Sequence, residues 1–128
     1  MDQKEIIDYW VTEAVEALNV AQHLFEKKDY SYALFFGHLA VEKILKAIVV
    51  RSGNFTVPRT HNLLRLAKEA GIEMNEVQQS ALIRITGFNL EARYPDYKKE
   101  FRKKCTRHFT RKELEKIREV SIWLKSKL

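Results

Sequence analysis

The residues best suited to chemistry lie in one stretch near the C-terminus, residues 93–112. Nine lysines and arginines face two acidic residues there, a charge of +7, while the other residues sum to −1 and the whole chain carries +6. Five residues separate Arg102 from His108 in this stretch. An arginine that steadies a phosphate and a histidine that moves a proton would suffice for metal-free RNA cleavage through the ribose 2′-hydroxyl. The two residues are therefore the candidate catalytic pair.

The same stretch also has the composition of a binding surface. Basic side chains bind phosphates, and the aromatic residues Tyr94, Tyr97, Phe101 and Phe109 are interleaved with them, as suits stacking on unpaired bases. The alternative is a solvated surface loop whose aromatic side chains attach it to the rest of the protein. The candidate nucleotide- or RNA-binding residues are Arg93, Tyr94, Asp96, Tyr97, Lys98, Lys99, Lys103 and Arg107.

Other kinds of active site find little support in the sequence. The four histidines lack the spacing of metal ligands, and no Gly-rich phosphate loop or nucleophile motif is present, so we expect neither a metal nor a cofactor. Lysines and arginines flank the single cysteine, Cys105, and predict a lowered thiol pKa. No positioned base accompanies this thiol, which favours an incidental role. His38 lies in an apolar run and is expected inside the core.

Periodic apolar residues predict the helices that position these side chains. The first runs from an Asp2 cap to about residue 27, and the second spans roughly 30–51 after an Asp29 cap. A short third helix begins at a Thr60 cap and ends at Gly71, and a capping box at Asn75 opens a fourth helix. The period fails after residue 90 for nearly twenty residues, which predicts a loop, and Thr110 with Glu113 then caps the last helix.

This pattern predicts an all-α protein, an up-and-down bundle of about five helices in a single domain, residues 1–128, with the two long N-terminal helices as a hairpin. A lone cysteine, a polar N-terminus and charged interruptions in the longest apolar stretch predict a cytoplasmic protein that does not enter a membrane. Phe35, Phe36 and Leu39 widen the apolar stripe of the second helix. They predict a dimer face or, equally, deeper packing in the same bundle.

Three motifs resemble those of the HEPN family, the higher eukaryote and prokaryote nucleotide-binding domain. Residues 35–47 read FFGHLAVEKILKA, residues 60–63 read THNL, and residues 92–96 read ARYPD. The order and separation of these motifs extend the resemblance over nearly the whole chain. It implies a helical bundle that is often a two-fold dimer, and in many bacterial and archaeal members a minimal nucleotidyltransferase partner in a toxin–antitoxin-like pair.

The resemblance also implies two activities between which the sequence must choose. Some members are metal-independent ribonucleases that use an Arg-x4-6-His motif near the dimer cleft, and others bind nucleotides without cleaving anything. If Arg93 is the motif arginine, no histidine follows at the required spacing, whereas Arg102 and His108 fit it. Because the ARYPD motif favours the first alignment, we expect binding rather than cleavage. An RNA-cleaving toxin and a pure dimerising module are the alternatives.

Overall fold

The computed structural model describes residues 1–128 as six α-helices without strands. The helices are α1 (Gln3–Glu26), α2 (Tyr30–Arg51), α3 (Leu63–Glu69), α4 (Glu76–Arg93), α5 (Pro95–Lys104) and α6 (Arg107–Lys125). The predicted all-α bundle is confirmed, with one helix more than expected.

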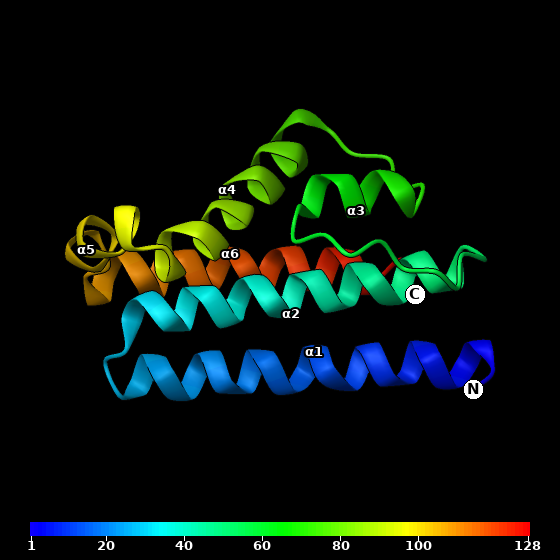
Figure 1. The fold of residues 1–128 in the computed structure, drawn as a ribbon, viewed down its shortest axis with the longest axis horizontal. Coiled ribbons are helices and arrows are strands. Elements are labelled where there is room, and N and C mark those ends of the chain that lie inside the picture. Colours follow the sequence, from blue (N-terminus) through cyan, green and yellow to red (C-terminus); the bar gives the residue numbers. More distant parts are fainter.

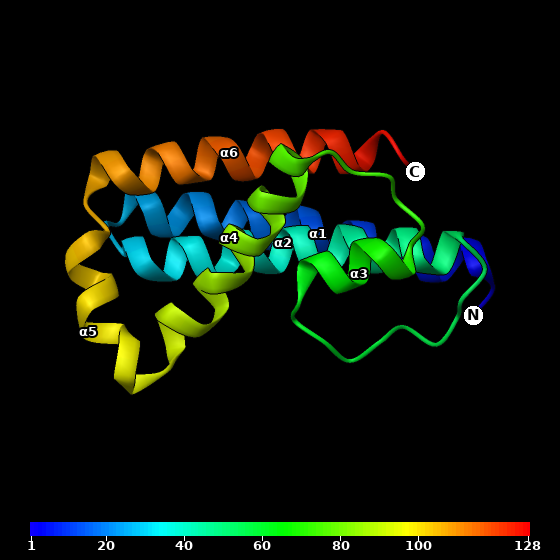
Figure 2. The same cartoon turned by 90° about the horizontal axis from the view of Figure 1, so that it is seen from above.

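The long helices α1 and α2 form the predicted antiparallel hairpin, and α2 is the centre of the molecule (Figure 1). The helix α6 runs beside α2, while α4 crosses α2 obliquely and α3 lies next to α4 (Figure 2). The apolar stripe of α2 explains this arrangement, because Leu34, Val41, Ile44 and Leu45 are completely or almost completely buried. One broad apolar helix can therefore pack against neighbours on several sides.

A glycine sets the distance between α2 and α6. A Cβ atom on Gly37 would lie 2.7 Å from the Cδ1 atom of Ile117, which is too close for an ordinary contact. Since Ile117 is itself fully buried, the two helices approach closely only because residue 37 has no side chain.

Several helix ends follow the local signals in the sequence. The Asp2 carboxylate accepts a hydrogen bond from the Glu5 N–H, and Asn75 with Gln78 forms a complete capping box. Gly71 follows α3 with a φ of 72°, the left-handed conformation that favours glycine. Asp29 is the N-cap of α2 as predicted, but its side chain makes no capping hydrogen bond.

Two predicted helix starts are wrong. The N-cap of α3 is Asn62, whose side chain accepts from the Arg65 N–H, while Thr60 instead accepts from the Asn62 N–H just before the helix. The N-cap of α6 is Thr106, which accepts from the Phe109 N–H. Thr110 is buried within α6, and its hydroxyl has no hydrogen-bond partner.

The predicted loop after residue 90 is also wrong, because most of it is the helix α5. Only Phe101 within α5, with Cys105 just after it, reaches the core, so the apolar period is too sparse to detect. The position of a proline and the order of charges in residues 95–104 are nevertheless typical of a helix. Pro95 occupies the first helical position, Asp96 lies in the first turn, and basic residues fill the last turn, as the helix dipole favours.

Candidate functional site

The excess positive charge gathers at one end of the bundle. There α5 and the first turns of α6 lie near the turn between α1 and α2 (Figures 1 and 2). Of the nine cations in residues 93–112, only Lys103 and Arg111 form ion pairs, and both pairs are exposed. We call this surface the basic end. Its seven cations without an ion pair are Arg93, Lys98, Lys99, Arg102, Lys104, Arg107 and Lys112.

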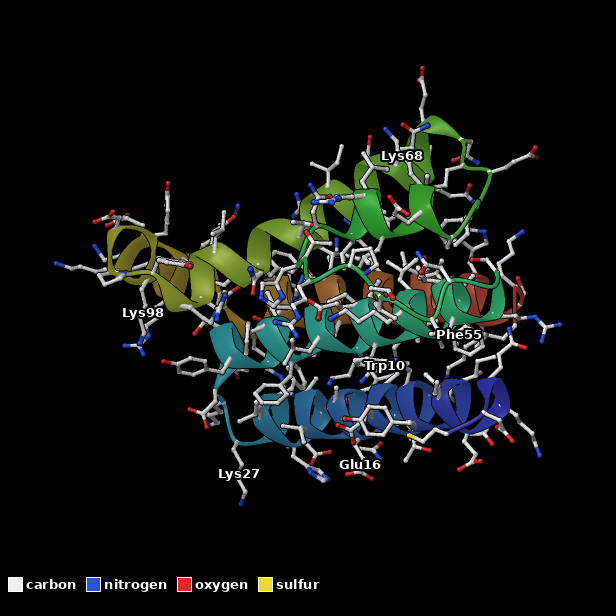
Figure 3. The ribbon with its side chains drawn as sticks, turned by 45° about the vertical axis from the view of Figure 1, so that its right-hand side comes forward. Trp10, Glu16, Lys27, Phe55, Lys68 and Lys98 are labelled. Atoms are coloured by element: carbon white, nitrogen blue, oxygen red, sulfur yellow. The ribbon has the colours of Figure 1, made fainter.

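Tyr32, at the start of α2, is the centre of one group of these cations. The Lys98 ammonium lies 5.3 Å and the Arg102 guanidinium 5.7 Å from the centre of the Tyr32 ring. Arg102 also donates a hydrogen bond of 3.3 Å from Nη2 to the Tyr32 hydroxyl. Hydrogen bonding by Lys98, reinforced by Arg102, lowers the pKa of the Tyr32 hydroxyl. Lys98 projects from α5 at the edge of the molecule (Figure 3).

Two of the four aromatic rings of the segment, Tyr94 and Phe109, already lie beneath the protein's own cations. The Arg93 guanidinium lies over the rings of Phe35 and Tyr94, and Lys104 lies over Phe109. The rings therefore position cations more than they offer faces to bases. Phe101, another predicted stacking residue, is buried against Phe88 in the core.

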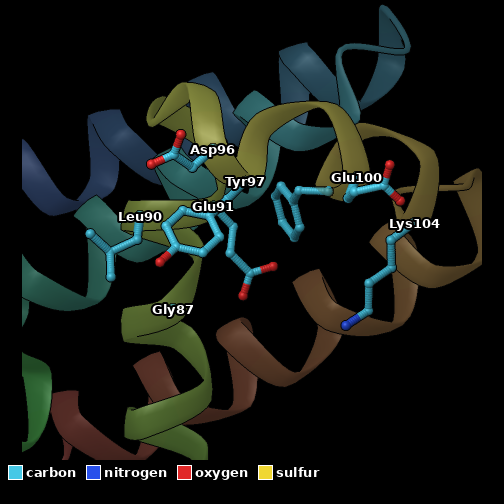
Figure 4. A pocket seen from close by; sticks show the side chains of 8 residues that line it. Gly87, Leu90, Glu91, Asp96, Tyr97, Glu100 and Lys104 are labelled. Atoms are coloured by element: carbon cyan, nitrogen blue, oxygen red, sulfur yellow. The ribbon is translucent and has the colours of Figure 1, made fainter.

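Tyr97 differs from those rings, because it is 53% exposed and no cation covers it. It lines a cavity of about 420 Å³ between α4 and α5, with Phe101 and Leu90 as apolar neighbours (Figure 4). Glu91, Asp96 and Glu100 also line this cavity. Lys104 is the one cation among its lining residues, so the net charge of the cavity is opposite to that of the basic end. Two of the predicted binding residues, Asp96 and Tyr97, are thus separated from the cavity that Arg102 lines at the start of α2.

The structure does not join the candidate catalytic residues. Arg102 lies in the last turn of α5 and bonds to Tyr32. His108 lies in the first turn of α6, fully outside the core, and its Nδ1 atom is 3.4 Å from the Nη2 atom of Arg111. Arg102 and His108 share no hydrogen bond within one chain.

A second polar cluster, which the sequence did not predict, surrounds Glu42 in α2. Its Oε1 atom accepts a hydrogen bond of 2.7 Å from His61 Nδ1, and its Oε2 atom accepts one of 2.9 Å from Lys46. His38, fully buried, donates from Nε2 to the His61 carbonyl oxygen at 3.0 Å. We call these four residues the Glu42 cluster. It ties the connection before α3 onto the central helix.

Burial and hydrogen bonding set the pKa values in the Glu42 cluster. Burial by itself would raise the pKa of Glu42, but hydrogen bonds from His61 and Lys46 outweigh it, and the pKa is lowered. Burial lowers the pKa of His38, which stays neutral. The spacing of His38, Glu42 and Lys46 along one helix face was readable in the sequence. The contact of His61 with Glu42 was not readable in the sequence, because the two residues are 19 positions apart.

The predicted lowering of the Cys105 thiol pKa is wrong. Its neighbours in sequence are basic, yet its side chain turns into the core, where it is 5% exposed. Burial raises the pKa of the thiol to about 12, with a further contribution from Glu91. The thiol is therefore neutral and shielded.

The predicted dimer or core face is partly exposed. Phe35 and Phe36 pack edge to face, with ring centres 5.5 Å apart, and both touch the core without being fully buried. Leu39, one turn further along α2, is also half-buried. The partial exposure of these three residues is compatible with both predicted roles, a dimer face and packing within the same bundle.

Comparison with known proteins shows which solved structure and which protein family this chain resembles. No helix combines the length and apolar character needed to cross a membrane. No curated protein matches the sequence. The crystal structure of TT1696 from Thermus thermophilus is similar, with a TM-score of 0.82 and 22% identity over 95% of this chain and 98% of that one. The family model of the HEPN domain matches residues 7–127, and the chain therefore belongs to the HEPN family.

Proposed function

We propose that this protein is a HEPN module that binds a nucleotide or RNA and acts as the partner of a minimal nucleotidyltransferase in a toxin–antitoxin-like pair. On this proposal it forms a homodimer and lacks strong catalysis of its own. The observation that carries the binding function is the set of seven cations without ion pairs at the basic end.

Electrostatics supports a polyanionic ligand. Cations gathered on one surface without acidic partners repel one another, and a phosphate-bearing ligand relieves that repulsion while releasing its own counterions. The basic end is also preorganised, since Tyr32 holds Lys98 and Arg102 in place. A preorganised surface loses less side-chain entropy on binding.

The geometry favours binding over cleavage. A histidine that moves a proton during RNA cleavage must reach the same substrate atoms that the arginine stabilises. His108 instead contacts Arg111, and no hydrogen bond joins it to Arg102, whose guanidinium bonds to Tyr32. The family, with members that bind nucleotides and pair with nucleotidyltransferases, supplies the rest of the proposal.

The test is to titrate the purified protein with labelled single-stranded RNA and with labelled ATP at 50 and 200 mM salt. We expect binding of at least one of them at low salt, weakening steeply as salt rises. A variant with alanine at Lys98, Lys99 and Lys103 should bind at least tenfold more weakly.

The matched control removes three exposed cations elsewhere, with alanine at Arg59, Arg65 and Lys68 near α3. It changes the net charge by the same amount and should alter affinity much less. Equal losses in both variants would mean that only overall charge matters. No binding of either ligand at low salt would refute the binding function.

Co-expression with a minimal nucleotidyltransferase encoded beside this gene tests the partner role. We expect the two proteins to co-purify through size-exclusion chromatography as a complex built on a dimer of this chain. A chain that elutes as a monomer and leaves the nucleotidyltransferase unbound would remove both the dimer and the partner from the proposal.

A further inference from the structure

A second cavity, of about 400 Å³, lies at the start of α2 within the basic end. Residues 28–32 line one side, and Arg102 and Cys105 line the other. The central helix of the protein thus begins at a cavity that the basic residues Lys28 and Arg102 also line.

The first N–H groups of α2 have no partner in the protein. Asp29, the N-cap, gives no side-chain hydrogen bond, and the first intrahelical bond of the helix runs from the Ala33 N–H to the Asp29 carbonyl oxygen. The N–H groups of Tyr30, Ser31 and Tyr32 accordingly remain without an acceptor. Such groups at the start of a 22-residue helix favour an anion, aided by the helix dipole.

The Ser31 hydroxyl gives an independent indication of a ligand. Ser31 is only 6% exposed and lines the cavity, yet its hydroxyl makes no hydrogen bond. Most serine hydroxyls in buried positions bond to the protein, as that of Ser121 bonds to the Ile117 carbonyl oxygen. A hydroxyl that has no partner in the protein, on a nearly buried residue that lines a cavity together with Lys28 and Arg102, is suited to an anionic oxygen.

We propose that this cavity binds a terminal phosphate monoester, the 5′-phosphate of a nucleotide or of an RNA end. The inference rests on the proposed function, because it assigns the terminal phosphate of the proposed nucleotide or RNA ligand to this cavity. Three N–H groups, a hydroxyl, a guanidinium and an ammonium exceed what the two free oxygens of an internal phosphodiester can use. A monoester offers three oxygens and a second negative charge.

Two other residues of the cavity, Cys105 and Asp29, affect its affinity for phosphate in different ways. Cys105 stays neutral and adds no competing charge, because burial raises its thiol pKa to about 12. The Asp29 carboxylate lines the cavity without an ion pair and opposes an anion. Replacing Asp29 by asparagine should therefore tighten the binding of a phosphate, whereas a purely structural cavity would show no such response.

The experiment compares two uridine hexanucleotides with a 3′ fluorophore, one with a 5′-phosphate and one with a 5′-hydroxyl. We expect the phosphorylated form to bind about tenfold more tightly to the wild-type protein. UMP should compete with it better than uridine does, which shows whether a free nucleotide occupies the same cavity as the RNA end.

Variants locate the preference. Arg102→Ala and Ser31→Ala should each reduce the ratio of the two affinities, and Asp29→Asn should increase it. Lys112→Ala, an exposed cation of α6 away from the cavity, should weaken both forms equally and leave the ratio unchanged. Ser31→Ala removes a single oxygen atom, so its fold can be verified by an unchanged melting temperature.

The outcomes separate the inference from the function on which it rests. Equal binding of both hexanucleotides to the wild-type protein would overturn the phosphate site and leave RNA binding intact. A ratio that Arg102→Ala and Ser31→Ala do not alter would also overturn it. Failure of both hexanucleotides and UMP to bind at low salt would overturn the proposed function as well.

Discussion

The Glu42 cluster and the basic end differ in whether their charged side chains are paired and buried. In the Glu42 cluster one buried carboxylate accepts hydrogen bonds from His61 and Lys46, and the nearby His38 is neutral. At the basic end five of the nine cations lie over aromatic rings, and none of these five has an ion pair. Charges that are paired and buried fix the fold, whereas charges that are exposed and unpaired remain free for a ligand. Substitutions, salt and acid should therefore affect the two regions differently.

The largest effect is expected from Glu42→Ala. This substitution leaves Lys46, whose side chain is only 13% exposed, without its carboxylate and removes the hydrogen bond of the His61 side chain to α2. We expect the free energy of unfolding to fall by about 3–5 kcal/mol, as measured by urea denaturation.

The control for this prediction is Glu115→Ala, which breaks an exposed ion pair with Arg111. It should cost less than about 1 kcal/mol. If both substitutions cost the same, the Glu42 cluster would not be the structural element that we describe.

The next largest difference is expected in the salt dependence of RNA binding and of stability. Raising the salt concentration from 50 to 200 mM should weaken RNA binding by about tenfold or more while changing the free energy of unfolding little, because buried pairs are screened less. Alanine at Lys98, Lys99 and Lys103 should make the logarithmic salt slope shallower by about 2, since each phosphate contact on a single strand contributes about 0.7. An unchanged slope would place the phosphate contacts elsewhere.

Acid should weaken the fold through the Glu42 cluster. The pKa values of both His38 and Glu42 are lower in the folded protein than in the unfolded chain. As the pH falls, the unfolded chain therefore binds protons more readily than the folded protein does. Their stabilising effect is complete above the ordinary pKa values of 6.5 and 4.5, respectively, and is lost as pH falls below each.

The melting temperature should therefore fall between pH 7 and pH 5 through His38, and fall further below pH 4.5 through Glu42. His38→Gln removes the first titration, and the variant should show a flatter profile between pH 7 and pH 5 whatever its absolute stability. A wild-type profile that is flat over the whole range would contradict these shifts.

The smallest effect is expected from His108→Ala. His108 is exposed and contacts only Arg111, so RNA affinity should change less than about twofold and expression in cells should remain harmless. RNA cleavage by the wild-type protein that this substitution abolishes would establish the ribonuclease alternative in place of a binding module.

The sequence by itself determined the features that depend on neighbours along the chain. Apolar periods located α1, α2 and α4, and short-range capping at Asp2 and Asn75 placed two helix starts correctly. The motifs in residues 35–47, 60–63 and 92–96 were sufficient for the HEPN family, which the family model confirms. The concentration of charge in residues 93–112 required only counting.

Only the tertiary structure decided the features that depend on burial. The sequence favoured Thr110, with Glu113 three residues on, as the cap of α6, but the core buries Thr110 within the helix and Thr106 caps it instead. Basic neighbours predicted a lowered pKa for the Cys105 thiol, but desolvation outweighs them and raises the pKa once the side chain enters the core. The meeting of His61 with Glu42 and of Arg102 with Tyr32 likewise required helices to pack, because chain separation hides such contacts from any local pattern.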